Sequence, residues 1–193
     1  MSTKLDLDDI LLAIIVAEEK KMEGRTRLQK LTYFVSKIIG YDAGFRPHYY
    51  GPYSPLVAAV VESQQSRGLL EESAFPFEFH DFPGHDGERK RYDYRLTEKG
   101  QQAYEWRYSE NEDEFIQVQE LVKKIGETGA DYRDLSFAAK IFSVIKEKGR
   151  AMTEPEIRRA AKQLGWSLDE KEMKKGLELL NSLELVRSKR KEH

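Results

Sequence analysis

The order of patterns between Gly24 and Gly100 constrains the fold of this chain more than any other feature. A helical pattern that ends at Gly40 is followed by the aromatic run FRPHYYGPYSP and by a second helical pattern that ends at Gly68. A basic hairpin, ERKRYDYR, and a helix start at Thr97 come next. Helix, short strand, helix, strand, hairpin turn, strand and helix is typical of a winged helix-turn-helix domain, which we therefore expect here.

Composition narrows the class of protein. With 193 residues, the chain suits one large domain or two small ones. It has no cysteine, which excludes disulfides, zinc fingers, iron–sulfur clusters and thiol catalysis. The apolar run from Leu11 to Ala17 is too short to span a bilayer, and the acidic start MSTKLDLDD lacks the apolar region of a signal peptide. We therefore expect a cytoplasmic protein with no membrane partner.

Motifs that carry catalytic chemistry are missing from the sequence. It has no glycine-rich phosphate loop, nucleophile elbow or metalloprotease helix motif. The pairs His80-Asp81 and His85-Asp86 contain metal-ligand types, but they surround a turn without helical spacing, and no further histidine lies nearby. We therefore expect no catalytic residues, no metal site and no cofactor.

Charge and pattern divide the chain into three segments. Residues 1–107 have 15 basic and 17 acidic side chains (net −2), residues 108–130 have 2 and 6 (net −4), and residues 131–193 have 15 and 11 (net +4). We expect a winged helix-turn-helix domain over 1–108, an acidic connecting helix and hinge over 109–130, and a second helix-turn-helix-like domain over 131–193. The predicted fold class is mainly α with a small β-wing, an α+β fold with tandem winged helix-turn-helix-like domains.

Caps and apolar spacing predict the elements of the first half. A helix over 9–22 is expected, with Asp6 or Asp8 as its cap, and a second helix opens at Thr26. Lys30 and Lys37 lie off the apolar stripe of that second helix. A third helix begins at Ser54-Pro55, with Leu56, Val57, Val60 and Val61 facing inward. Gly51 is expected to take a backbone geometry that other residues resist, with the neighbouring tyrosines packed between the second and third helices.

In the second half, helix starts are predicted from capping boxes, in which a cap residue is followed three positions later by Glu. The predicted boxes are Ser109 with Glu112, Thr153 with Glu156, and Ser167 with Glu170. A helix is expected from Ser136 to Lys148, and a short closing strand at Leu185, Val186 and Arg187.

An apolar stripe on the acidic connecting helix predicts assembly. Phe115, Val118, Val122 and Ile125 recur at helical spacing, and a stripe of this kind must pack against something. Helix-turn-helix proteins often bind DNA as dimers. We expect a homodimer with this helix in or near the interface.

Candidate DNA-binding residues lie at three places. Guanidinium groups in the basic hairpin can reach phosphates or a minor groove, and the start of the second helix can present arginines together with free N–H groups to phosphate. The third helix supplies the recognition face. The predicted set is Arg25, Arg27, Ser63, Gln65, Arg67, Arg89, Lys90, Arg91 and Arg95.

The same residues also allow solvated charged surfaces with no nucleic acid. Glu88 and Asp93 neutralise part of the hairpin, and the third helix offers Glu62 and two alanines where Arg, Asn or Gln would read bases. In the second half, Arg158 and Lys162 are four residues apart and repel, which an anionic partner would relieve. A protein-interaction role is therefore the alternative.

The chain resembles a known family through its first half. The residues that carry the resemblance are GRTRLQKLTYFV, YYGPYSPLVAAVV, GLLEE and YDYRLTEKG, which span roughly 8–107. They look like the uncharacterised YwgA-type proteins of bacteria and archaea and, more distantly, LQKLTYF with YGPYSP resembles the N-terminal signature of Panacea-domain antitoxins. The resemblance implies a winged-helix fold and brings no catalytic residues, and the second half departs from the short antitoxin pattern.

Together these patterns predict a cytoplasmic, homodimeric protein that binds double-stranded DNA through a winged helix and regulates transcription. The alternative is an antitoxin-like winged-helix module that binds a protein partner and no DNA.

Overall fold

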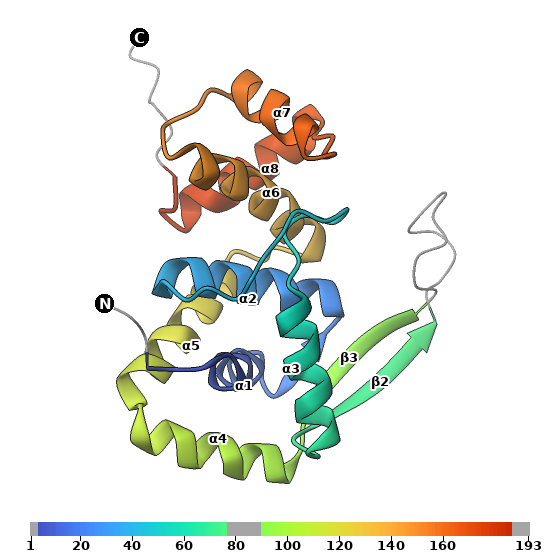
Figure 1. Ribbon diagram of the computed structural model, residues 1–193, viewed down its shortest axis with the longest axis vertical. Helices are drawn as coiled ribbons and strands as arrows, with labels where there is room; N and C mark the ends of the chain where they lie inside the picture. The colour runs from blue at the N-terminus through green and yellow to red at the C-terminus, as the bar shows by residue number, and fades with distance from the viewer. Residues whose placement is uncertain (1–3, 77–89, 187–193) are drawn as a thin grey trace.

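A computed structural model describes residues 4–76 and 90–186 and is mainly helical, with one small antiparallel sheet (Figure 1). This confirms the α+β class. The helices are α1 Leu7–Ala17, α2 Arg25–Ile39, α3 Pro55–Ser66, α4 Glu98–Glu110, α5 Glu112–Glu127, α6 Tyr132–Lys148, α7 Glu154–Gln163 and α8 Glu170–Ser182. The strands are β1 Lys21–Glu23, β2 Leu70–Pro76 and β3 Lys90–Leu96.

Helix α1 is the centre of the first half. Asp6 caps it in a capping box with Asp9, and its apolar residues are buried nearly all round. A helix that is apolar on all sides needs neighbours on all sides, and α1 contacts α2, α3, α4, α5, β1 and β3. The predicted extension to residue 22 is wrong, because Glu19 and Lys20 adopt left-handed backbone angles (φ 55° and 66°) that stop the helix and lead into β1.

The sheet has the strand order β1-β3-β2, with both pairings antiparallel. Tyr94 of β3 lies opposite Met22 on one side and Glu72 on the other. Met22 and Tyr94 are both buried, so this face of the sheet packs on the helices. Strand β1 was not predicted, since three residues are too few to show an alternating pattern.

Helix α3 begins as predicted, with Ser54 as N-cap and Pro55 in the first turn. Its inward positions are Val57, Val61 and Gln64, which follow i, i+4, i+7 spacing. Leu56, predicted to face inward, is instead 54% exposed because it lies one position off this stripe. The short strand predicted in the aromatic run is reduced to a single bridge between Arg46 and Tyr53.

Helix α4 extends into the acidic connection between the two halves and ends at Glu110, just before Asn111. The predicted capping box of Ser109 with Glu112 does not form, because α4 continues to Glu110 and the Ser109 hydroxyl donates to the Trp106 carbonyl within that helix (2.7 Å). Asn111 then separates α4 from α5.

The apolar stripe of α5 is core of this same chain. Phe115, Val118, Val122 and Ile125 are all buried, and α5 contacts α1 and α2. The stripe therefore needs no second chain, because neighbouring helices already cover it. A homodimer with this helix in or near its interface stays a prediction.

In the second half, α8 packs along α6. The capping box of Thr153 with Glu156 is confirmed, whereas the last one is made by Asp169 with Glu172 instead of the predicted Ser167 and Glu170. Helix α6 starts four residues before the predicted Ser136 because Asp131 caps it. Leu185 and Val186 form no strand, and Arg187 lies outside the described residues.

Helix α6 joins the two halves by packing on α2 (Figure 1). The ring of Phe142 lies 6.3 Å from that of Tyr33 and 6.1 Å from that of Phe34. The Trp166 indole N–H donates to the carbonyl of His48 across the same junction (2.7 Å). Buried apolar residues of both halves form one continuous core. The division of the chain into three segments stays a prediction.

Candidate interaction surface

Arg25, at the start of α2, is bound to the sheet. Its guanidinium carbon lies 3.8 Å from the centre of the Tyr92 ring, and its Nε donates to the Tyr94 hydroxyl (2.8 Å). Its Nη2 forms an ion pair with Glu72 at 3.1 Å. Stacking, hydrogen bonding and the ion pair together orient Arg25 along β2 and β3.

Arg27 is a structural link between three elements. It bonds both carboxylate oxygens of Glu18 (2.6 and 2.8 Å) and also donates to the Ala130 carbonyl (3.1 Å). Its side chain is only 18% exposed. The hydrogen bonds to Glu18 raise the pKa of Arg27 further, so its guanidinium stays charged. Arg27 thus joins the ends of α1 and α2 to the segment that precedes α6.

The exposed face of α3 has little positive charge. Ser63 is exposed, Gln65 is half-buried, and the neighbouring Glu62 is exposed. Arg67, just after the helix, forms an ion pair with Asp8 at the start of α1. The described face therefore presents serine, a carboxylate and one paired arginine.

The strands of the hairpin divide the remaining predicted residues. Lys90 and Arg95 are exposed on β3. Arg91 forms an ion pair with Asp93 (2.8 Å), and its guanidinium carbon lies 5.4 Å from the Phe75 ring centre. Arg89 and both His-Asp pairs lie outside the described residues.

Charges of both signs alternate over the outer face of the sheet. Strand register places Arg95 between Lys21 and Glu71, and Asp93 between Glu23 and Ser73. Three cations (Lys21, Arg91, Arg95) and three carboxylates (Glu23, Glu71, Asp93) share this face, which is therefore neutral. The structure brings Arg91 and Arg95 together on this face, and it brings carboxylates with them.

The LQKL and YGPYS segments are joined by buried hydrogen bonds. Gln29 accepts from the Ser54 N–H (2.9 Å) and donates to the Ser54 carbonyl (3.0 Å). Lys30 Nζ donates to the Pro52 carbonyl (2.7 Å). Two of the sequence segments that carry the family resemblance therefore hold one another in place.

Sequence reasoning missed the environment of Lys30. Lys30 lies off the apolar stripe of α2, yet this residue is only 2% exposed because the 51–54 turn and α6 cover it. Burial, together with the nearby cation of Lys140, lowers the pKa of Lys30 to about 7. The joint presence of LQKL and YGPYS, on which the family resemblance rests, was the only sequence signal that this lysine had a specific contact.

Gly51 has the backbone geometry that was predicted for it. Its φ is +96°, and a Cβ there would lie 3.2 Å from Lys140 Cγ and 3.4 Å from the Ser136 carbonyl. The prediction that all neighbouring tyrosines are packed is wrong for Tyr49, which is exposed at the tip of the turn.

Helix α4 carries an exposed tryptophan that sequence reasoning did not single out. Tyr104 is buried against α5, where its ring centre lies 5.4 Å from that of Phe115. Trp106 points away from this packing and is 61% exposed. In Figure 1, α4 runs along the edge of the molecule opposite to α6–α8.

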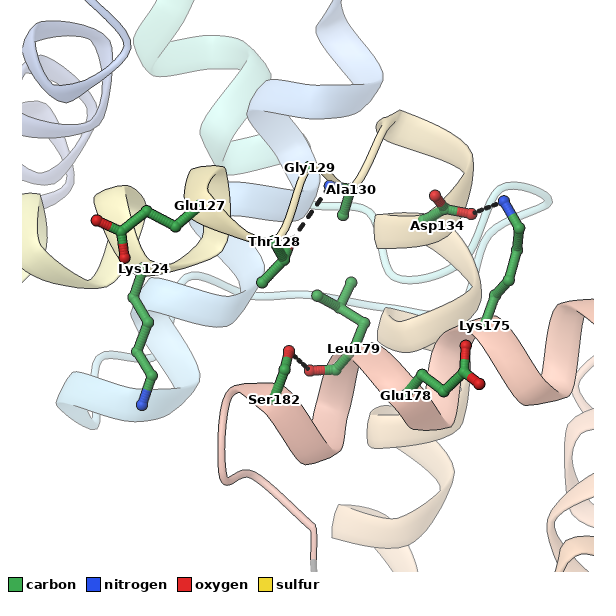
Figure 2. A pocket seen from close by; sticks show the side chains of 10 residues that line it. All are labelled: Lys124, Glu127, Thr128, Gly129, Ala130, Asp134, Lys175, Glu178, Leu179 and Ser182. Carbon is green, nitrogen blue, oxygen red and sulfur yellow. Dashed lines mark hydrogen bonds and ion pairs between the residues drawn. The ribbon is translucent and has the colours of Figure 1, made fainter.

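A cleft of about 610 Å³ lies where α5 ends and α6 begins, beside α8 (Figure 2). Lys175 and Asp134 form an ion pair across it (2.7 Å), and Lys124, Glu127 and Glu178 add charges of both signs. Leu179 is the one buried residue among those that line it. Enclosed ligand sites are mostly apolar with a few convergent polar groups, so this cleft does not resemble one.

Within residues 4–76 and 90–186, no three His, Cys, Asp or Glu side chains are grouped as metal ligands would be. Over the same residues, no helix combines the length and apolar character needed to cross a bilayer.

Comparison with known proteins finds no protein family that matches this chain. No curated protein sequence matches it either.

Proposed function

We propose that this chain is a protein-interaction module built on a winged-helix arrangement, and that it does not act by binding DNA. The order α1, β1, α2, α3, β2, β3, with β3 central in the sheet, supports a winged-helix arrangement of the first half. The three helices α6, α7 and α8, with a short turn before α8, support a helix-turn-helix-like second half.

The observation that carries the proposal is the pairing of the predicted DNA-binding arginines. Arg25, Arg27, Arg67 and Arg91 each form an ion pair with a carboxylate of the same chain. Exposed ion pairs such as that of Arg67 with Asp8 contribute only about 0–1 kcal/mol, so their strength alone does not prevent a phosphate contact.

The location of the carboxylates matters more than the strength of the pairs. DNA affinity comes largely from cations that replace the counterions of the phosphates. A carboxylate within ion-pairing distance of each guanidinium would be carried toward the phosphates with it and would be repelled by them. A neutral sheet face and an α3 face with little positive charge give weak attraction to DNA.

A DNA-binding transcriptional regulator is the second candidate. The exposed cations Lys90 and Arg95 on β3 favour it. Its cytoplasmic, homodimeric form stays a prediction.

Fluorescence anisotropy with a labelled mixed-sequence duplex separates the two candidates. We expect no salt-sensitive binding at micromolar protein. Binding that falls steeply between about 50 and 200 mM salt would support DNA recognition. In that case Lys90→Ala with Arg95→Ala should weaken it, whereas Lys146→Ala with Lys148→Ala, two exposed cations of the second half, should not.

Affinity purification in the presence of nuclease tests the protein-interaction role independently of DNA binding. A retained protein supports the role only when the purified partner then binds this chain directly in solution. Partners that all disappear on nuclease treatment would contradict it.

A further inference from the structure

Trp106 is the most exposed large hydrophobic side chain among the described residues. Its helix is held from the other side, where the Tyr104 hydroxyl accepts from Gln119 of α5 (2.9 Å). Tryptophan is enriched among the residues that contribute most to protein–protein binding. The α4 face around Trp106 therefore has an exposed anchor residue, and the Arg107 guanidinium, itself paired with Asp9, lies 5.6 Å from the centre of its ring.

The segment that contains Trp106 has a strongly negative net charge. Residues 98–114 contain six acidic and two basic side chains, so the net charge is −4. Both cations are already bound: Lys99 donates to the Arg67 carbonyl (2.8 Å), and Arg107 bonds both carboxylate oxygens of Asp9 (2.7 and 2.9 Å). Among the described residues, none of the exposed carboxylates of this segment forms an ion pair; these are Glu98, Glu105, Glu110, Glu112 and Asp113.

Helix electrostatics explain only some of these carboxylates. Glu112 and Asp113 lie in the first turn of α5, where negative charge is stabilising. Glu110 is the last residue of α4, where the partial negative charge of the helix end opposes a carboxylate. Glu110 is also four residues after Trp106, so both side chains lie on the same face of α4. Glu110 therefore adds negative charge beside Trp106 at a cost to the helix.

We propose that the α4 face around Trp106, together with the start of α5, binds an arginine- or lysine-rich segment of a partner protein. This rests on the proposed protein-interaction function. A guanidinium stacks favourably on an indole ring, and its N–H groups pair with carboxylates in a bidentate geometry. The anchor and the surrounding charge thus recognise the same kind of side chain.

The two tryptophans of the chain make this binding directly observable. Trp106 is 61% exposed, whereas Trp166 is 2% exposed and hydrogen-bonded to His48. Acrylamide in solution therefore quenches mainly the fluorescence of Trp106. Ligand binding on the α4 face should protect that fluorescence and leave Trp166 unaffected.

The probe is a short acetylated and amidated peptide of alternating arginine and leucine, compared with the same peptide carrying glutamate for arginine. We expect the arginine peptide to bind and to reduce acrylamide quenching, and the glutamate peptide to do neither. Trp106→Ala should weaken binding at least about tenfold. Glu110→Gln should weaken it by a smaller factor without lowering the melting temperature, a combination that a purely structural role of Glu110 would not produce. Leu56→Ala, at an exposed apolar residue of α3, is the matched control and should bind as the wild type does.

Several results would overturn the proposal. These are failure of the wild type to bind the arginine peptide, equal binding of both peptides, and equal binding by Trp106→Ala. Self-association of the wild type that Trp106→Ala abolishes, seen by light scattering, would instead make a second copy the occupant. None of these results concerns DNA. The proposed function is refuted by a different result, which is salt-sensitive binding of the wild type to duplex DNA.

Discussion

A buried lysine makes the stability of this protein depend on pH in a way that one substitution can remove. Lys30 Nζ has one hydrogen bond, to the Pro52 carbonyl, and its cationic neighbour is Lys140 of α6. Glu172 of α8 acts on Lys140, whose own pKa is lowered by burial. A protonated Lys30 is therefore desolvated beside a like charge.

The size of the effect follows from the pKa of Lys30, which is about 7 in the folded protein against 10.5 ordinarily. Because the unfolded chain binds more protons between these values, the free energy of unfolding rises with pH across that window. At 1.36 kcal/mol per pH unit, burial of the protonated Lys30 amine lowers the free energy of unfolding by about 5 kcal/mol below pH 7. Between pH 7 and pH 9 about 2 kcal/mol of this cost is relieved.

Lys30→Met keeps most of the side-chain volume and removes the titrating amine. It also leaves the Pro52 carbonyl without its donor, which costs about 1–3 kcal/mol at every pH. We therefore expect the variant to be more stable than the wild type at pH 7 or below. The difference should change sign near pH 9, where the two effects are about equal.

Urea unfolding, followed by far-ultraviolet circular dichroism at a series of pH values, measures this difference, since the other titrating groups are common to both proteins. Lys37→Met is the control, with the same substitution at an exposed position of α2. The free energy of unfolding of this control should change with pH in parallel with that of the wild type. Wild-type and Lys30→Met curves that are parallel from pH 6 to pH 9.5 would refute the reasoning.

Two further substitutions test close packing and a buried charge. At Gly100 a Cβ would lie 2.2 Å from the Leu69 carbonyl oxygen, so Gly100→Ala should lower the free energy of unfolding by about 2 kcal/mol. Gly126→Ala, with nothing within 4 Å, should leave it unchanged or raise it slightly in the same urea titration. Arg107→Met should cost about 3 kcal/mol, because it strands the buried Asp9 carboxylate. The double variant Arg107→Met with Asp9→Leu should recover most of that loss, and a double variant no more stable than the single one would contradict this account.

Local sequence determined which segments are helices and where most of them start. Ser54-Pro55, Thr97 and Thr153 with Glu156 cap α3, α4 and α7 as their sequence patterns predict. These contacts join residues a few positions apart, so short-range chemistry decides them. The α1 boundary was less predictable, because neither Glu19 nor Lys20 is a residue type that signals a left-handed turn.

Periodicity also predicted that the stripe on α5 is buried, but not which surface buries it. An apolar stripe is satisfied equally by another chain or by its own, and only the path of the chain placed α1 and α2 against Phe115 and Val118. Trp106 was equally ambiguous, since helical spacing alone does not say which side of α4 meets the core.

The charges show most clearly what tertiary structure alone decided. The sequence determined how many arginines the predicted DNA-binding set contains, and the fold determined what each one faces. Arg25 and Glu72 are 47 residues apart, and Arg67 and Asp8 are 59 apart. Lys30 meets Pro52 only because α2 and the aromatic turn fold together beneath α6. Sequence carries the sign of a charge, whereas its partner, its burial and hence its pKa depend on residues that only the folded chain brings near.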